Sequence, residues 1–238
     1  GVFLVWQIRR DWPAVAALRF RATPHDLALA TAAGVAGLVL LPAAFTLTLR
    51  RVGLYRPAHR WFYGRIWLQA YLYRYVPGKV MLVAERVRLG ARAGIGAGES
   101  VLLVVWETLL LMVGAALVLV LLFGFAAGGA GDRLWPIAGG ALAVGLLVAF
   151  PPALRWLAGR WPRLAALGVL RLRPRDQLAL AAVYGAAWLC LGASFFFACR
   201  IFVDLPLDLL PTVEFWFVGG YVAGLVAAVA PAGLGVRE

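Results

Sequence analysis

Long apolar runs separated by short polar segments dominate the chain. An apolar stretch of about 20 residues is long enough to cross the hydrocarbon core of a bilayer as a helix. The pattern therefore predicts an all-α, polytopic transmembrane helical bundle with about six spans. Five runs reach this length, and the apolar start of the chain counts as part of a sixth. They are residues 27–49, 101–125, 135–157, 178–203 and 213–230, with 1–8 as the partial one.

A further segment, residues 61–76, is too short and too charged for an ordinary span. It is rich in Trp and Tyr, which favour the head-group region of a membrane, and it carries two arginines. Pro77 and Gly78 then interrupt the helical pattern. We expect one or two re-entrant or interfacial helices here, the first at 61–76, followed by an amphipathic, basic stretch at 79–99.

The composition excludes several other classes of protein. Of the 238 residues, 63% are hydrophobic and 14% are charged, against about 45–50% and 25% in soluble domains. The net charge is +12, almost entirely from arginine. In such an apolar chain, the excess of positive charge indicates basic loops that set the orientation in the membrane rather than a nucleic-acid-binding surface. An additional role in holding anionic lipid head groups stays open. A soluble enzyme, a disordered chain and a nucleic-acid-binding module are excluded.

The distribution of basic residues predicts the orientation. Residues 50–99 hold ten Lys and Arg and residues 155–176 hold six, whereas 125–134 holds one and 204–210 holds none. Cytoplasmic loops carry such an excess, so we place 50–99 and 155–176 in the cytoplasm. If the loops alternate between the two sides, residues 9–26 lie outside, and their four arginines conflict with that placement. We let the two larger basic clusters determine the orientation.

Catalytic and metal-ligating constellations are missing from the sequence. Cys190 and Cys199 lie nine residues apart in one apolar run and cannot comfortably pair with each other. The two histidines are isolated from them, and neither serine shares a segment with a histidine. We therefore expect no metal, no cofactor and no catalytic residues, which favours a protein that is not an enzyme.

Charged residues within apolar runs are the main candidates for function. Glu107 lies in a span, where a carboxylate faces a partner, the bundle interior or a water-filled path; an arginine pair that only locks helix packing is the alternative. Glu214 suits the first turn of its helix, where the dipole favours an acid. Arg200 is explained by snorkelling to the outer interface. Gly220 and Gly224 form a weak GxxxG signal for close helix approach.

Two turns rich in Pro and Gly interrupt apolar helices and have charged residues beside them. Broken backbone at membrane depth is tolerated only inside protein or beside a wet cavity, and transporters build substrate sites there. A surface loop is the alternative. We expect Arg86, Glu107 and Arg237 to converge on one polar cavity between the two turns. The candidate substrate-binding residues are Tyr75, Pro77, Gly78, Lys79, Arg86, Glu107, Pro231, Gly233, Gly235, Arg237 and Glu238.

The two turns resemble motifs of the lysylphosphatidylglycerol synthase transmembrane-region family, also called the flippase-like domain family. Its pattern has a Tyr-x-Pro-Gly-x-Val turn with a following Arg, an acidic residue in the next span, and a late Pro-x-Gly-x-Gly-x-Arg-Glu turn. The matching residues are Tyr75, Pro77, Gly78, Val80, Arg86, Glu107, Pro231, Gly233, Gly235, Arg237 and Glu238. The resemblance implies one flippase-like integral membrane domain over 1–238, cut at both ends, in a prokaryotic inner membrane.

The resemblance also implies that the protein handles lipids. The leading interpretation is a flippase or translocase for an anionic or aminoacylated phospholipid or a lipid-linked precursor. The alternative is a membrane subunit or platform of an enzyme that transfers aminoacyl or glycosyl groups to lipid-linked substrates, and a third is a scaffold that recruits a synthase. Membrane lipids, anionic or polyprenyl-linked, are the expected partners, and no nucleic acid is expected. A transferase partner and a homo-oligomer stay open.

Overall fold

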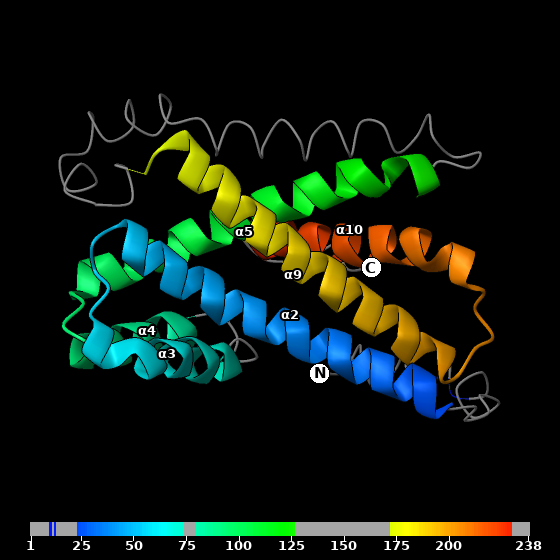
Figure 1. The fold of residues 1–238 in the computed structure, drawn as a ribbon, viewed down its shortest axis with the longest axis horizontal. Helices are drawn as coiled ribbons and strands as arrows, with labels where there is room; N and C mark the ends of the chain where they lie inside the picture. Colours follow the sequence, from blue (N-terminus) through cyan, green and yellow to red (C-terminus); the bar gives the residue numbers. More distant parts are fainter. Residues whose placement is uncertain (1–9, 11, 13–22, 74–79, 127–171, 230–238) are drawn as a thin grey trace.

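A computed structural model describes residues 10, 12, 23–73, 80–126 and 172–229 of the chain (Figure 1). Within these ranges every regular element is a helix. The long or medium helices are α2 (Pro24–Arg51), α3 (Arg60–Leu72), α4 (Val80–Arg92), α5 (Ala97–Ala126), α9 (Pro174–Arg200) and α10 (Leu210–Val229), and the single-turn 3-10 helices are η1 (Pro57–His59) and η4 (Leu207–Leu209).

Three described helices are long and apolar enough to cross a membrane. They contain the candidate spans Pro24–Arg51, Ala97–Phe123 and Arg175–Arg200. The described part of the chain is therefore all-helical, and its three apolar helices indicate a multi-pass membrane protein. Helix α10 covers nearly all of the expected run 213–230. The expected runs 135–157 and 1–8 lie outside the described residues, so the described helices do not confirm a count of six.

Helices α2 and α9 run antiparallel, side by side (Figure 1), and an ion pair joins them at each end. At one end Arg200 Nε lies 3.0 Å from the Asp26 carboxylate, and at the other Arg51 lies 2.9 Å from Asp176. Each acid lies in the first turn of its helix and each arginine in the last turn. This order complements both helix dipoles, so the antiparallel arrangement satisfies charge and dipole together.

Small residues let the middles of α2 and α9 approach closely. The Ser194 hydroxyl donates a hydrogen bond to the Ala30 carbonyl at 2.7 Å. A Cβ at Gly34 would lie 2.8 Å from the Ser194 hydroxyl, and one at Gly37 would lie 2.8 Å from Leu191. Close packing of this kind holds helices together in lipid, where apolar burial alone gives little drive.

Helix α5 crosses α9 at a pair of glycines. A Cβ at Gly114 would lie 2.8 Å from the backbone nitrogen of Gly185, so the two backbones touch there. The weak GxxxG signal of Gly220 and Gly224 has no matching contact among the described residues, since a Cβ at either position would meet nothing within 4 Å. The close approach lies on α5 and α9 instead, with α10 packed against both.

Two expectations for charged residues need correction. Arg200 does not simply snorkel; it pairs with Asp26 and donates to the Leu205 carbonyl at 2.9 Å. Glu214 lies beyond the first turn of α10, because the helix starts at Leu210, earlier than expected. Its side chain is buried, and its Cγ would lie 2.9 Å from a Cβ at Gly192 of α9, so the dipole does not explain it.

Helices α3 and α4 pack against one another at one end of the bundle, α3 also against α2 and α4 against α5. Each has 13 residues and is about 20 Å long, shorter than the roughly 30 Å hydrocarbon core. The length of α3 agrees with a helix too short for an ordinary span at 61–76, and α4 covers most of the amphipathic, basic stretch expected at 79–99. The turn between α4 and α5 contains Gly94 at φ +74°, with the Arg56 guanidinium packed over it.

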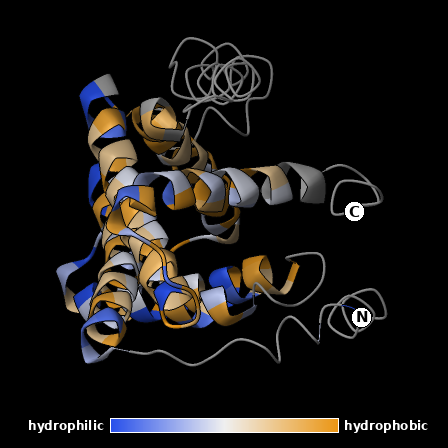
Figure 2. Ribbon diagram, turned by 90° about the vertical axis from the view of Figure 1, so that its right-hand side faces the viewer, coloured by the Kyte–Doolittle hydropathy of each residue, from blue (hydrophilic) through white to orange (hydrophobic). Residues whose placement is uncertain are grey.

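The two ends of the bundle differ in charge. One end holds α3, α4, the end of α2 and the start of α9, and it carries the eight described arginines between residues 50 and 92. Residues 204–210, with two aspartates and no basic residue, lie at the other end. Figure 2 shows hydrophobic colouring along most helix lengths and hydrophilic colouring at several helix ends. This grouping agrees with the alternation predicted from the basic loops.

Candidate functional site

An ion pair is buried where α4 meets α5. Arg86 Nη2 donates to Glu107 Oε2 at 2.7 Å, and the two side chains are only 7% and 10% exposed. Taking two charges out of water costs free energy that the pair alone repays only with good geometry and further hydrogen bonds. Such an arrangement in an apolar span is therefore a candidate for function.

The amphipathic pattern of α4 turns Arg86 toward the interior. Arg86 lies on the buried face of α4 together with Leu89 and Gly90. Its guanidinium carbon stacks 4.3 Å from the ring centre of Phe45 on α2 and lies 5.9 Å from that of Trp67 on α3. Four helices thus converge on one guanidinium, and the aromatic rings stabilise its charge through cation–π contacts.

Several polar atoms of the pair have no hydrogen-bond partner among the described residues. These are Nε and Nη1 of Arg86 and Oε1 of Glu107. A buried polar atom without a partner costs about 1–3 kcal/mol, and more when the group is charged. Native proteins keep such atoms where water, an ion or a ligand completes them. The free N–H groups of Arg86 can receive an anion, and the free oxygen of Glu107 can receive a cation or a proton donor.

Further buried polar groups line the interior near the pair. The Tyr184 hydroxyl of α9 and the indole nitrogen of Trp106 on α5 have no hydrogen-bond partner within the described ranges. The Tyr184 hydroxyl lies close enough to Arg86 and Glu107 to interact electrostatically with both charges, and the indole of Trp67 lies beside the Glu107 carboxylate. The largely apolar core between α2, α3, α4, α5 and α9 therefore contains several buried polar groups around the ion pair.

A second Glu–Arg pair on α4 provides a contrast. Glu85 accepts two hydrogen bonds from Arg88, at 2.7 and 2.6 Å, and one from Gln69 of α3 at 2.9 Å. The Arg88 hydrogen bonds hold the pKa of the Glu85 carboxyl below its usual value of 4.5. Arg88 is half exposed and both oxygens of Glu85 are used, so this pair ties α3 to α4 without offering a free site.

The structure brings together two of the sequence-predicted site residues, Arg86 and Glu107. The others fall on segments whose placement is not described. These are Tyr75, Pro77, Gly78, Lys79, Pro231, Gly233, Gly235, Arg237 and Glu238.

The sequence interpretation missed the aromatic surroundings of Arg86. Phe45, Trp67 and Tyr184 come from three helices far apart in the sequence. Trp67 belongs to the aromatic-rich segment 61–76, which indicated that rings lie in this region. No residue pattern shows which of these rings lies against an arginine of another helix.

The described residues contain no group of three or more His, Cys, Asp or Glu that could hold a metal ion. Cys190 and Cys199 are both free and partly buried on α9. The groups that the Arg86–Glu107 site offers are ionic and hydrogen-bonding.

The chain was compared with protein-family models, with curated proteins and with solved structures, and none of the three comparisons gave a match.

Proposed function

We propose that the chain is a lipid translocase domain that moves an anionic or aminoacylated phospholipid, or a related lipid-linked precursor, across a prokaryotic cell membrane. The observation that carries this proposal is the buried Arg86–Glu107 pair with unpartnered donors on Arg86. The resemblance of the two turns to the flippase-like domain family points to the same class.

The guanidinium of Arg86 suits a phosphate head group. Its planar fork donates two parallel hydrogen bonds to phosphate oxygens, which a lysine ammonium cannot copy. Nε and Nη1 are the two donors not engaged by protein. Glu107 holds Nη2 and neutralises the arginine when no lipid is bound, and it can meet the ammonium of an aminoacylated head group.

The depth of the pair fits a head-group path. Glu107 lies six residues beyond the start of the apolar run 101–125, which is about 9 Å along the axis of α5. That distance is within the roughly 30 Å hydrocarbon core. A charged head group that crosses the membrane needs a polar station at this depth, because an unpaired charge there is costly.

The test is a head-group accessibility assay in reconstituted vesicles. Vesicles of phosphatidylcholine with a trace of fluorescent phosphatidylglycerol are treated with a membrane-impermeant quencher, and the protected fraction falls as lipid moves outward. R86K and E107Q are expected to slow this exchange at least tenfold, because each removes the bidentate donor or the resident anion while keeping side-chain size.

The second pair on α4 supplies matched controls. R88K and E85Q make the same chemical changes within the second pair on α4, where both oxygens of Glu85 are already engaged. They are expected to exchange lipid at the wild-type rate. Wild-type exchange in R86K and E107Q, with normal expression, would leave the buried pair a packing role only. Absence of exchange in the unmutated protein would refute the translocase itself.

A further inference from the structure

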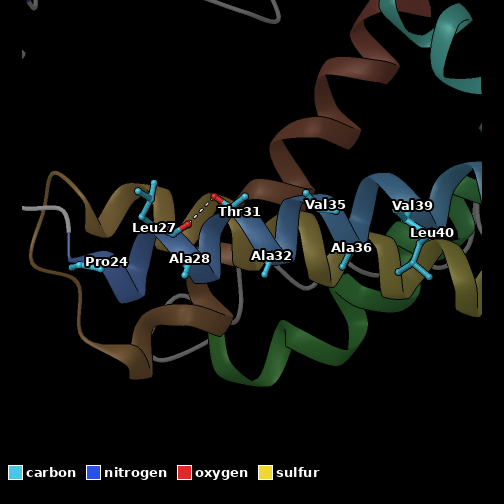
Figure 3. Close-up of a pocket in the computed structure, with 9 residues that line it drawn as sticks. All are labelled: Pro24, Leu27, Ala28, Thr31, Ala32, Val35, Ala36, Val39 and Leu40. Atoms are coloured by element: carbon cyan, nitrogen blue, oxygen red, sulfur yellow. Dashed lines mark hydrogen bonds between the residues drawn. The ribbon is translucent and has the colours of Figure 1, made fainter.

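One face of α2 is exposed along nearly its whole length. A shallow apolar groove of about 940 Å³ follows it, and Thr31, Val35 and Val39 are among the side chains on it (Figure 3). The buried residues of α2, such as Gly37 and Ala44, lie on the opposite face. The exposed stripe continues at helical spacing through Ala43 and Thr46 to Arg50, at the basic end of the bundle.

The stripe leads into a second groove of different character. This groove, about 430 Å³, lies between α2 and α3 and is lined by residues of both helices. A Cβ at Gly64 would meet nothing within 4 Å, so the groove is open at that point. Its lining includes Pro42, Ala43, Gly64, Arg50, Arg60 and Trp61. Two positive charges therefore flank a space at the end of an apolar face.

The two arginines are held in place by aromatic rings. The guanidinium carbon of Arg50 lies 4.5 Å from the ring centre of Tyr55, and that of Arg60 lies 5.4 Å from the indole of Trp61. Stacking of this kind orients a guanidinium while most of its N–H groups stay available. Trp61 is 81% exposed, and Trp is enriched at the depth of lipid head groups.

We propose that this groove, the α2–α3 basic groove, binds the phosphate of an anionic phospholipid, with an acyl chain lying along the exposed stripe of α2. From Val35 to Arg50 is about 22 Å of helix, which exceeds the roughly 15 Å depth of one leaflet's hydrocarbon. A positive groove continuous with an apolar stripe matches the two parts of such a lipid. The site is separate from the buried Arg86–Glu107 pair, and it does not depend on translocation.

The binding test uses native mass spectrometry of the full chain in a neutral detergent, titrated with dioleoyl-phosphatidylglycerol. An arginine near the membrane surface contributes about 1 kcal/mol to anionic-lipid binding. Removal of two such charges in R50Q/R60Q should weaken binding about 30-fold, equivalent to about 2 kcal/mol. The control R65Q/R92Q removes two exposed arginines outside the groove and should change binding less than threefold.

A second measurement locates the lipid in the unmutated protein. Phosphatidylglycerol with a photoactivatable group on one acyl chain should form adducts on α2 between residues 31 and 47. Glycerol 3-phosphate, tested at the same concentrations, should not bind, since it lacks the acyl chains that cover the stripe.

The outcomes are decisive. Equal phosphatidylglycerol binding by R50Q/R60Q and wild type, or adducts confined to other helices, would overturn the site. Binding of glycerol 3-phosphate as tight as that of the lipid would show a soluble phosphate ligand and overturn the lipid assignment. Equal binding of phosphatidylcholine would remove the role of head-group charge.

Discussion

The carboxylate of Asp26, in the first turn of α2, lies 3.0 Å from Nε of Arg200, in the last turn of α9. The Asp26 carboxylate also accepts a hydrogen bond from the Thr23 hydroxyl at 2.7 Å, and the Asp26 backbone N–H donates to the Thr23 hydroxyl oxygen at 3.0 Å, so Thr23 caps the start of α2. The pair is mostly buried, whereas Arg51 at the opposite end of α2 is half exposed in its pair with Asp176. The two ends should therefore differ in what they contribute to stability.

We predict that R200Q costs about 1–3 kcal/mol, because it leaves a buried acceptor short of its charged donor. R51Q should cost less than about 1 kcal/mol, as expected for an exposed pair. The thermal unfolding midpoint in detergent measures both. Equal shifts for the two variants would contradict the difference in burial.

The Arg86–Glu107 pair should show strong coupling in a double-mutant cycle. R86M or E107L alone leaves a buried charge unpaired and should cost about 3–5 kcal/mol, while R86M/E107L removes both charges and should cost much less than the sum. Thermal midpoints of the four proteins give the coupling. If R86M/E107L is stable yet fails to move lipid, the pair serves function rather than folding; additive losses would argue against contact between the two side chains.

The glycine crossing of α5 and α9 should not tolerate a methyl group. G114A places a Cβ 2.8 Å from the Gly185 nitrogen and 3.0 Å from the Ala181 carbonyl, both backbone atoms that cannot turn away. We expect a loss of about 1–3 kcal/mol. G220A meets nothing within 4 Å and should be neutral, or slightly stabilising through helix propensity. Thermal midpoints that rank the two variants in reverse would refute the crossing.

Glu85 should make part of the stability depend on pH. Its pKa is held below 4.5 by Arg88 in the folded protein, so its contribution is full above pH 4.5 and is lost as the pH falls through the lower folded value. The thermal midpoint of E85Q should lie below that of wild type at pH 6, and the gap should close as the pH drops well below 4.5. A gap that stays constant with pH would exclude this ion pair as its source.

The orientation can be tested by thiol labelling in intact cells, after Cys190 and Cys199 are replaced by Ala. A cysteine at Ala58, beside α3, should resist a membrane-impermeant reagent, and one at Asp208, in η4, should react. Both positions are exposed in the structure, so accessibility reports the side of the membrane. The reverse labelling pattern would invert the topology.

The apolar runs predicted the bounds of the helices better than the contacts between them. The expected runs at 27–49, 101–125 and 178–203 match α2, α5 and α9 to within a few residues, because bilayer thickness sets the length of a span. Helix starts shifted where local hydrogen bonds act: α5 begins at Ala97 because Glu99 accepts from the Gly96 N–H at 2.9 Å.

The sequence pattern could not predict which side chains of different helices contact one another. Glu107 was singled out by its position in an apolar run, and Arg86 by its place after a turn, but their contact depends on how α4 packs on α5. Arg200 was assigned to snorkelling because nothing near it in sequence shows that Asp26 lies at its side. Gly114 and Gly185 form no motif along the chain, yet they touch where two helices cross.

The two ion pairs between α2 and α9 restrict how these helices can move relative to one another. With Asp26–Arg200 and Arg51–Asp176 closing its two ends and Ser194 bonded to Ala30 between them, sliding or rotation of either helix would break bonds at both ends at once. We therefore expect the two helices to move together. If the proposed lipid exchange opens the buried guanidinium of Arg86, we expect α4 and α3 to move relative to the α2–α9 pair.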